Sequence, residues 1–156
     1  MIKISPTFKT LLENLKNIEN QQITQENKII NMCDNIISRI NIIEQCYLLK
    51  ETDEISTIKV LKRLYTDYTG IESTINTIDI CYKEDILLLN ILIFLEIFYS
   101  KITSKYKNDR FNLIFCSHEE FGTFRFHMIR DYEPLWIDLE FVRNTKELII
   151  CINDDE

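Results

Sequence analysis

The spacing of the apolar residues changes once in this chain, close to Arg110. Before that point apolar side chains recur every three or four residues, which is the period of an amphipathic helix. After it they alternate with polar ones, which is the period of a strand. No segment rich in Gly, Pro or Ser separates the two parts. The sequence therefore predicts one α+β domain over 1–156, with a helical part over 1–110 and an antiparallel sheet over 111–156.

The helical part is expected to hold about four main helices. Ser5 and Pro6 suit the start of the first, as N-cap and first helical residue. The second is predicted over 24–49, because apolar residues there recur at alternating spacings of four and three. The third is predicted over 52–70, where a glycine stands at the end. The fourth is predicted over 83–105 and contains the most apolar run of the chain.

The sheet part contains four predicted strands, at 111–117, 123–130, 135–142 and 147–153. The short links between them favour an antiparallel meander with one apolar face. The second strand is expected to bury Phe124 and Phe126 and to expose Arg125 and His127. The apolar face must be covered, and the helix of the run 86–99 is expected to cover it.

Composition argues against several classes of site. The chain has two glycines, too few for a Gly-rich phosphate-binding loop. Five cysteines without a CxxC pair, and only two histidines, argue against a zinc site. We assign no metal and no cofactor, and we expect the thiols to be free and buried in a reducing compartment. The cysteines are Cys33, Cys46, Cys81, Cys116 and Cys151.

The sequence also predicts a cytoplasmic protein without membrane contact. The first ten residues lack the apolar segment of a secretory signal. The run 86–99 has 14 residues and includes Asn90 and Glu96, whereas a membrane span needs about 20 apolar residues.

Three groups of residues suggest catalysis, and each lacks a necessary partner. His118 precedes Glu119 and Glu120 in a predicted turn, but no nucleophile is identifiable beside them. Asp138 and Glu140 point the same way from a predicted strand, but a second cluster that would hold a metal is missing. Pairing of Cys116 with His118 or His127 lacks a third, orienting group. We therefore assign no catalytic residue, while a small enzyme that uses these carboxylates or histidines remains an alternative.

The negative charge is concentrated in the sheet part. Residues 111–156 hold 10 acidic and 4 basic residues, whereas residues 1–110 hold 15 and 14. A net charge of −7 argues against direct binding of nucleic acid. Two aromatic residues are interleaved with the acids, a combination that suits a binding surface for a basic protein, although acidity can also serve solubility alone. The predicted partner-binding residues are Glu119, Glu120, Asp131, Tyr132, Glu133, Trp136, Asp138 and Glu140.

The whole chain, small, acidic, rich in Ile and Asn and without a catalytic motif, resembles the immunity proteins of bacterial toxin systems, above all those of contact-dependent growth inhibition. The resemblance implies tight binding of one cognate toxin, often a basic nuclease, whose active site or substrate surface is blocked. It carries over no individual residue, and the segment 131–141 is expected to make the contact by its charge. A structural protein, such as a viral or phage factor that oligomerises through its helices, is a further alternative, and the oligomeric state stays open.

Overall fold

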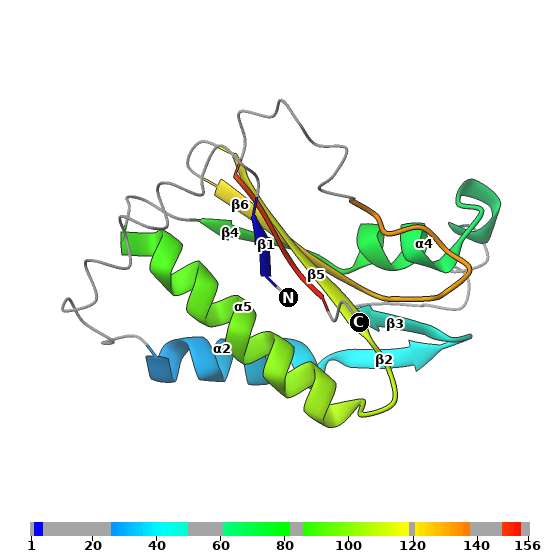
Figure 1. The fold of residues 1–156 in the computed structure, drawn as a ribbon. Coiled ribbons are helices and arrows are strands. Elements are labelled where there is room, and N and C mark those ends of the chain that lie inside the picture. The colour runs from blue at the N-terminus through cyan, green and yellow to red at the C-terminus, as the bar shows by residue number, and fades with distance from the viewer. Residues whose placement is uncertain are drawn as a thin grey trace.

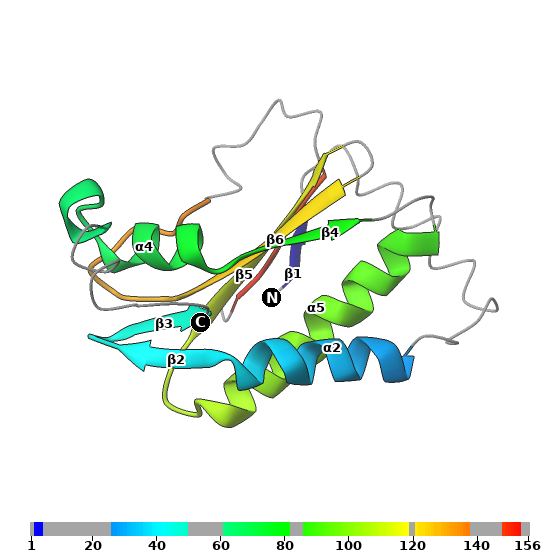
Figure 2. The same cartoon turned by 180° about the vertical axis from the view of Figure 1, so that it is seen from behind.

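A computed structural model describes residues 2–4, 26–49, 61–81, 86–118, 121–137 and 148–153. The fold is α+β, as predicted, with antiparallel sheets and a layer of helices. Figures 1 and 2 show helices α2 (Glu26–Ser38) and α5 (Ile86–Lys105) together on one side of the main sheet. A two-stranded hairpin and helix α4 (Tyr68–Ile75) lie at one end of the molecule.

The main sheet has five strands in the order β1-β7-β5-β6-β4. Strands β5 (Phe111–His118) and β6 (Phe121–Met128) form its central hairpin. Strand β7 (Ile149–Ile152) pairs with β5, β1 (Ile2–Ile4) pairs with β7, and β4 (Thr77–Cys81) pairs with β6. Each of these pairs is antiparallel.

The predicted meander is wrong, although three of its strands exist. In a meander the last strand would pair with the third, but β7 pairs with β5, the first of the series. Of the predicted third strand 135–142, residues 135–137 lie outside any strand, and the others lie outside the described residues. The place beside β6 is taken instead by β4, which belongs to the part of the chain predicted as helical.

Two helices cover one face of this sheet and close the main core. Helix α5 (Ile86–Lys105) nearly matches the prediction over 83–105, and it packs beside α2 (Glu26–Ser38). The rings of Phe94 and Phe98 meet Phe124 edge to face, with centroids 4.9 Å apart in both pairs. Burial of these large apolar side chains between two layers is the main source of stability.

The opposite face of the sheet is also buried at its centre, which corrects the prediction of a single apolar face. Ile114 is fully buried there with Cys151, and Ile137 from the segment after β6 packs against them. His127, predicted to be exposed, has no exposed surface. The prediction failed because the covering segment runs back over this face and replaces solvent.

The second predicted helix is correct only in its first half. Helix α2 ends at Ser38, and the strands β2 (Ile40–Ile43) and β3 (Cys46–Leu49) follow as a hairpin. Its two turn residues, Glu44 and Gln45, have φ angles of 48° and 73°. Positive φ at both positions is the geometry of a tight hairpin turn, which normally carries Asn or Gly.

The third predicted helix is interrupted. Residues 61–64 are helical, but the helix stops before Tyr65, and α4 (Tyr68–Ile75) begins after a new N-cap. That cap is Asp67, whose Oδ1 accepts a hydrogen bond from the Gly70 backbone N at 2.6 Å. Gly70 therefore lies in the first turn of a helix and does not end one.

Two side chains of α4 join the hairpin to the main sheet. Asn76, at the C-cap, donates to the backbone O of Tyr47 in β3 at 2.6 Å and of Phe126 in β6 at 3.1 Å. One turn earlier, Glu72 accepts from the backbone N of Tyr47 at 2.8 Å and of Met128 at 2.7 Å. These bonds satisfy backbone groups that a direct strand pairing would otherwise use.

In the described ranges no helix has the length and apolar character needed to cross a bilayer. Four cysteines are present as thiols and not as disulfides, as predicted: Cys33, Cys46, Cys116 and Cys151. The prediction that they are buried is correct for three of them, whereas Cys116 is partly exposed. The helix predicted to begin at Ser5 lies outside the described residues.

Candidate functional site

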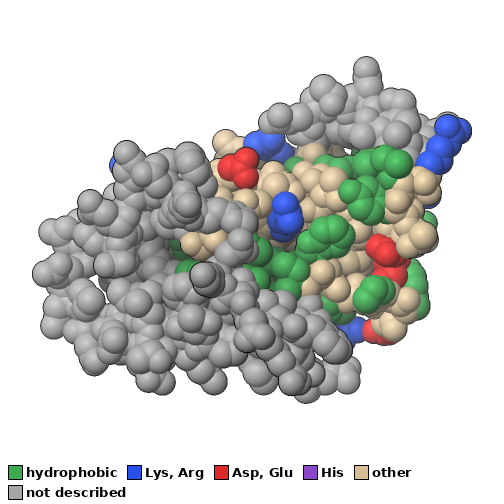
Figure 3. All heavy atoms as spheres, turned by 90° about the horizontal axis from the view of Figure 1, so that it is seen from above, with side chains coloured by type: hydrophobic (Ala, Val, Ile, Leu, Met, Phe, Trp, Pro, Cys, Tyr) green, Lys and Arg blue, Asp and Glu red, His purple; other side chains and the backbone are tan. Residues whose placement is uncertain are grey.

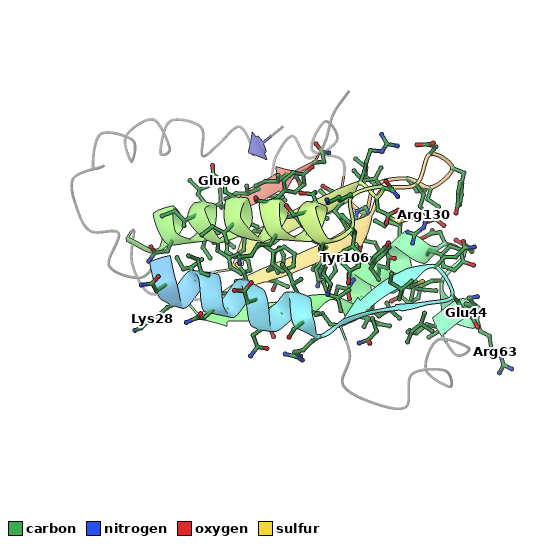
Figure 4. The ribbon with its side chains drawn as sticks, turned by 90° about the horizontal axis from the view of Figure 1, so that it is seen from below. Lys28, Glu44, Arg63, Glu96, Tyr106 and Arg130 are labelled. Carbon is green, nitrogen blue, oxygen red and sulfur yellow. The ribbon has the colours of Figure 1, made fainter. Side chains whose placement is uncertain are left out.

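The end of the molecule that carries α4 is organised around a buried ion pair. Arg130 and Glu72 have side chains 1% and 0% exposed, and Arg130 Nη2 lies 2.7 Å from Glu72 Oε1. Nη1 donates to the second carboxylate oxygen at 3.2 Å, and Nη2 also donates to the backbone O of Gln45 at 2.8 Å. The pair therefore links α4, the hairpin turn and the segment that follows β6. Figure 4 shows Arg130 at this end, where Glu44 and Arg63 also lie.

A second carboxylate, that of Glu133, binds the free backbone N–H groups at the N-terminus of α4. Its Oε1 accepts from the Tyr68 backbone N at 3.0 Å, and its Oε2 accepts from the Thr69 backbone N and hydroxyl, both at 2.8 Å. Burial alone would raise the pKa of Glu133, but these hydrogen bonds outweigh it and hold the pKa below its ordinary value. The segment after β6 is thus fastened to α4.

A pocket of about 470 Å³ opens beside this N-terminus, and we call it the α4 pocket. Its volume lies within the range of about 300–1,000 Å³ that is usual for ligand pockets. Three tyrosines contribute to its wall: Tyr65 and Tyr68 from the chain around the start of α4, and Tyr132 from the segment after β6. The remaining wall residues are Lys62, Thr66, Asp67, Ile71, Glu133 and Pro134.

The absence of a side chain at Gly70 keeps Tyr65 in place in the pocket wall. A Cβ at this position would lie 2.8 Å from Cδ1 of the Tyr65 ring and 3.1 Å from Asp67 Oδ1. Tyr65 also receives a hydrogen bond from the Thr74 hydroxyl at 3.0 Å. Gly70, in the first turn of α4, therefore leaves the space that the Tyr65 ring occupies in the pocket wall.

Two predicted partner-binding aromatics are exposed in this region. Tyr132 is 72% exposed and Trp136 is 38% exposed. Exposed Tyr and Trp side chains are enriched among the residues that dominate binding at protein interfaces. Figure 3 shows hydrophobic side chains among charged ones on the described part of one face.

Behind Trp136, His127 forms a buried polar contact. Its Nε2 lies 3.1 Å from the Asn112 amide nitrogen and 3.5 Å from the backbone N of Trp136. Its Nδ1 lies 3.1 Å from the backbone O of Met128. The donors around Nε2 fit a neutral ring with its proton on Nδ1. Burial lowers the pKa of His127 to about 4.

The eight predicted partner-binding residues have different outcomes. Tyr132 and Glu133 meet in the α4 pocket, but the carboxylate of Glu133 serves the helix. Asp131 is exposed and forms an ion pair with Arg110. Glu119, Glu120, Asp138 and Glu140 lie outside the described residues.

The geometry opposes one of the catalytic pairings considered from the sequence. Cys116 faces Thr123 across the hairpin and His127 faces Asn112, so the two residues are four positions apart along it. At about 3.3 Å per residue, this separation is too long for a nucleophile and its base. The described ranges also contain no group of three His, Cys, Asp or Glu residues able to hold a metal ion.

Comparison with known proteins places the chain in a family. The model of the Uncharacterized protein PM0498 family matches residues 7–156. The chain belongs to this family. Neither the curated proteins nor the solved structures contain a match.

In this member of the PM0498 family, sequence reasoning missed the helical wall of the pocket. Tyr65 and Tyr68 lie within the continuous helix predicted over 52–70, and their spacing of three fits the helical period. The available signal was Asp67, three residues before Gly70 in a polar interruption, which is typical of an N-cap. Arg130 also gave no signal, since its buried partner Glu72 lies 58 residues earlier.

Proposed function

We propose that this PM0498-family protein is an inhibitory binding protein of the immunity type, acting in the cytoplasm. Its target would be a basic, nuclease-like toxin. The observation that carries this proposal is the exposure of Tyr132, 72% of whose surface is in contact with solvent beside the α4 pocket.

The chemistry of the surface supports a protein partner. An exposed aromatic ring offers a large area that loses water on binding at a low cost in side-chain entropy. Asp131, the residue before Tyr132, is an exposed carboxylate that pairs with Arg110. Of the 25 acidic residues of the chain, 10 lie in residues 111–156. Negative charge of this kind speeds encounter with a basic protein and favours it over acidic competitors.

The rigidity of the segment also supports binding. Glu133 and Arg130 both bind α4, and Tyr132 lies between these two residues in the chain. The backbone that carries Tyr132 is therefore held at both ends. A side chain presented on a fixed backbone loses less entropy on association than one on a free loop.

The test is neutralisation of a toxin in cells. The reading frames beside the gene are expressed one at a time, and any that stops growth is then expressed together with this chain. We expect growth to be restored, and a one-to-one complex to be recovered from those cells. Lack of rescue for every toxic neighbour, with the chain present in folded form, would contradict the proposal.

A pair of variants separates the surface from the fold. Tyr132→Ala should abolish or weaken the rescue, while Met32→Ala, which removes an exposed apolar side chain from α2, should leave it unchanged. Equal rescue by both variants would exclude the Tyr132 surface as the contact.

A further inference from the structure

We propose that the α4 pocket receives the guanidinium group of an arginine side chain from the partner protein. This inference rests on the proposed function and names the chemical group that the surface recognises.

The pocket wall already binds cations of its own chain. Lys62 Nζ lies 5.3 Å from the centroid of the Tyr68 ring, and Arg130 Cζ lies 5.2 Å from it. Both distances are within the range of about 6 Å for attraction between a cation and the face of a ring. Tyr68 is thereby occupied, whereas Tyr132 presents most of its surface to solvent and is the ring available to a guest.

The wall also holds a carboxylate oxygen that is largely available. Asp67 uses Oδ1 to cap α4, at 2.6 Å from the Gly70 N. Among the described residues, its Oδ2 receives one long hydrogen bond, of 3.4 Å, from the Thr66 hydroxyl. Both carboxylate oxygens of Glu133 already accept hydrogen bonds from the N-terminus of α4. A guanidinium stacked on Tyr132 could therefore direct its N–H groups toward Asp67 Oδ2, in the flat geometry that Arg provides and Lys does not.

An anion does not fit the same place. The N-terminal N–H groups of α4, which would attract an anion, are bound to Asp67 and Glu133. The pocket wall contains two acidic residues, Asp67 and Glu133, and one basic residue, Lys62. A negative group would thus meet repulsion where the helix would otherwise have attracted it.

Lys62 lines the pocket and carries a positive charge, the same sign as the guanidinium guest. Its ammonium pairs with Glu44 and remains 38% exposed. A guest guanidinium must enter against this charge, so removing the charge should favour entry. Lys62→Met should therefore bind the guest more tightly, a gain that misfolding cannot produce.

The experiment uses N-acetyl-arginine amide as the probe and N-acetyl-citrulline amide as its uncharged control. Each is titrated into the full chain, with the tyrosine ring resonances followed by NMR. We expect the arginine probe to shift Tyr132 and Tyr65 saturably at millimolar concentration, and the citrulline probe to shift them much less. Equal shifts by the two probes would overturn the proposal.

Variants locate the contact within the pocket. Asp67→Asn keeps a capping oxygen and removes the charge, and we expect about two- to fivefold weaker binding. Asp131→Asn removes a neighbouring charge outside the pocket wall and should have a smaller effect. Lys62→Met should strengthen binding, and unchanged or weaker binding by this variant would count against the proposal.

The outcomes also separate this inference from the proposed function. If a toxin is neutralised through Tyr132 but the arginine probe leaves the pocket unshifted, the arginine site is wrong and the inhibitor stands. If the probe binds as expected but no toxin is neutralised, the site stands and the function is wrong.

Discussion

Glu72 and Arg130 form a buried, two-armed ion pair, with contacts of 2.7 and 3.2 Å between Nη2 and Oε1 and between Nη1 and Oε2. The carboxylate also accepts hydrogen bonds from the backbone N of Tyr47 and Met128. One side chain thus meets the hairpin, the main sheet and the segment that carries Tyr132. The position of the candidate surface depends on this contact.

Removing one member of the pair should strongly destabilise the fold. Glu72→Met removes the nearer counter-charge of the buried guanidinium and leaves it the longer contact of 3.6 Å with Glu133. We expect a loss of about 3 kcal/mol in the free energy of unfolding. Urea titration followed by circular dichroism measures this loss. As a control, Asp34→Ala breaks an exposed pair with Lys101 and should cost less than about 1 kcal/mol.

The double variant Glu72→Met with Arg130→Met tests the reason for that loss. If the poorly compensated charge of buried Arg130 is the main cause of that loss, the double variant should be more stable than Glu72→Met alone. Losses that simply add would show that the two side chains act independently, against the coupling described here.

Glu133→Gln should lower the stability of the fold, because this carboxylate serves the start of α4 and not a partner. The Glu133 side chain is 6% exposed, and its carboxylate accepts three hydrogen bonds at the start of α4. Its negative charge also interacts favourably with the positive end of the helix dipole. We expect a loss of about 1 kcal/mol in the free energy of unfolding, measured by urea titration. Asp131→Asn, at an exposed neighbouring carboxylate, should change stability by less than about 0.5 kcal/mol.

The buried His127 should make stability fall as the pH falls below neutrality. Its pKa is about 4 in the fold, against about 6.5 in the unfolded chain, so between these values the unfolded state binds more protons. The contribution is fully present above pH 6.5 and is lost as the pH falls toward 4. Between pH 7 and pH 5 His127 should contribute a loss of about 2 kcal/mol to the free energy of unfolding.

His127→Gln provides the comparison for this pH effect. The variant cannot take up the proton, so its loss between pH 7 and pH 5 should be clearly smaller than that of the wild type. Equal losses in urea titrations at the two pH values would show that His127 is not the responsible group.

Gln45→Gly should stabilise the β2–β3 hairpin. Gln45 has a φ of 73°, a backbone conformation that glycine adopts without strain. We expect a gain of about 0.5–1 kcal/mol in the free energy of unfolding. The bond from Arg130 goes to the backbone O of Gln45 and should be retained. A loss of stability would contradict the turn geometry.

Some elements could be predicted from the sequence because a single local signal determined them. Helix α5 contains a long apolar run, and β5 and β6 show clear alternation. The hairpin β2–β3 was missed because isoleucines at spacings of three and four fit a helix, and the turn Glu44-Gln45 carries neither Asn nor Gly. Burial of His127 depends on a segment that crosses the sheet, which alternation alone cannot reveal.

The candidate site shows the same division. Tyr132 and Trp136 were selected because aromatic residues among acids are chemically distinctive, and both are exposed. Glu133 was selected by the same rule, yet its carboxylate caps α4, because a helix 65 residues earlier in the chain supplies the donors. Charge in the sequence indicates a polar environment, but only the fold decides which carboxylates remain available to a partner.

The most direct test of the central claim is calorimetric titration of the chain with the toxin that it neutralises. A surface that binds a basic protein through Tyr132 and surrounding acids predicts a one-to-one complex whose affinity falls as salt is added. It also predicts that Tyr132→Ala weakens binding by about tenfold or more, while Met32→Ala binds like the wild type. Affinity that is independent of salt and unchanged by Tyr132→Ala would contradict the account.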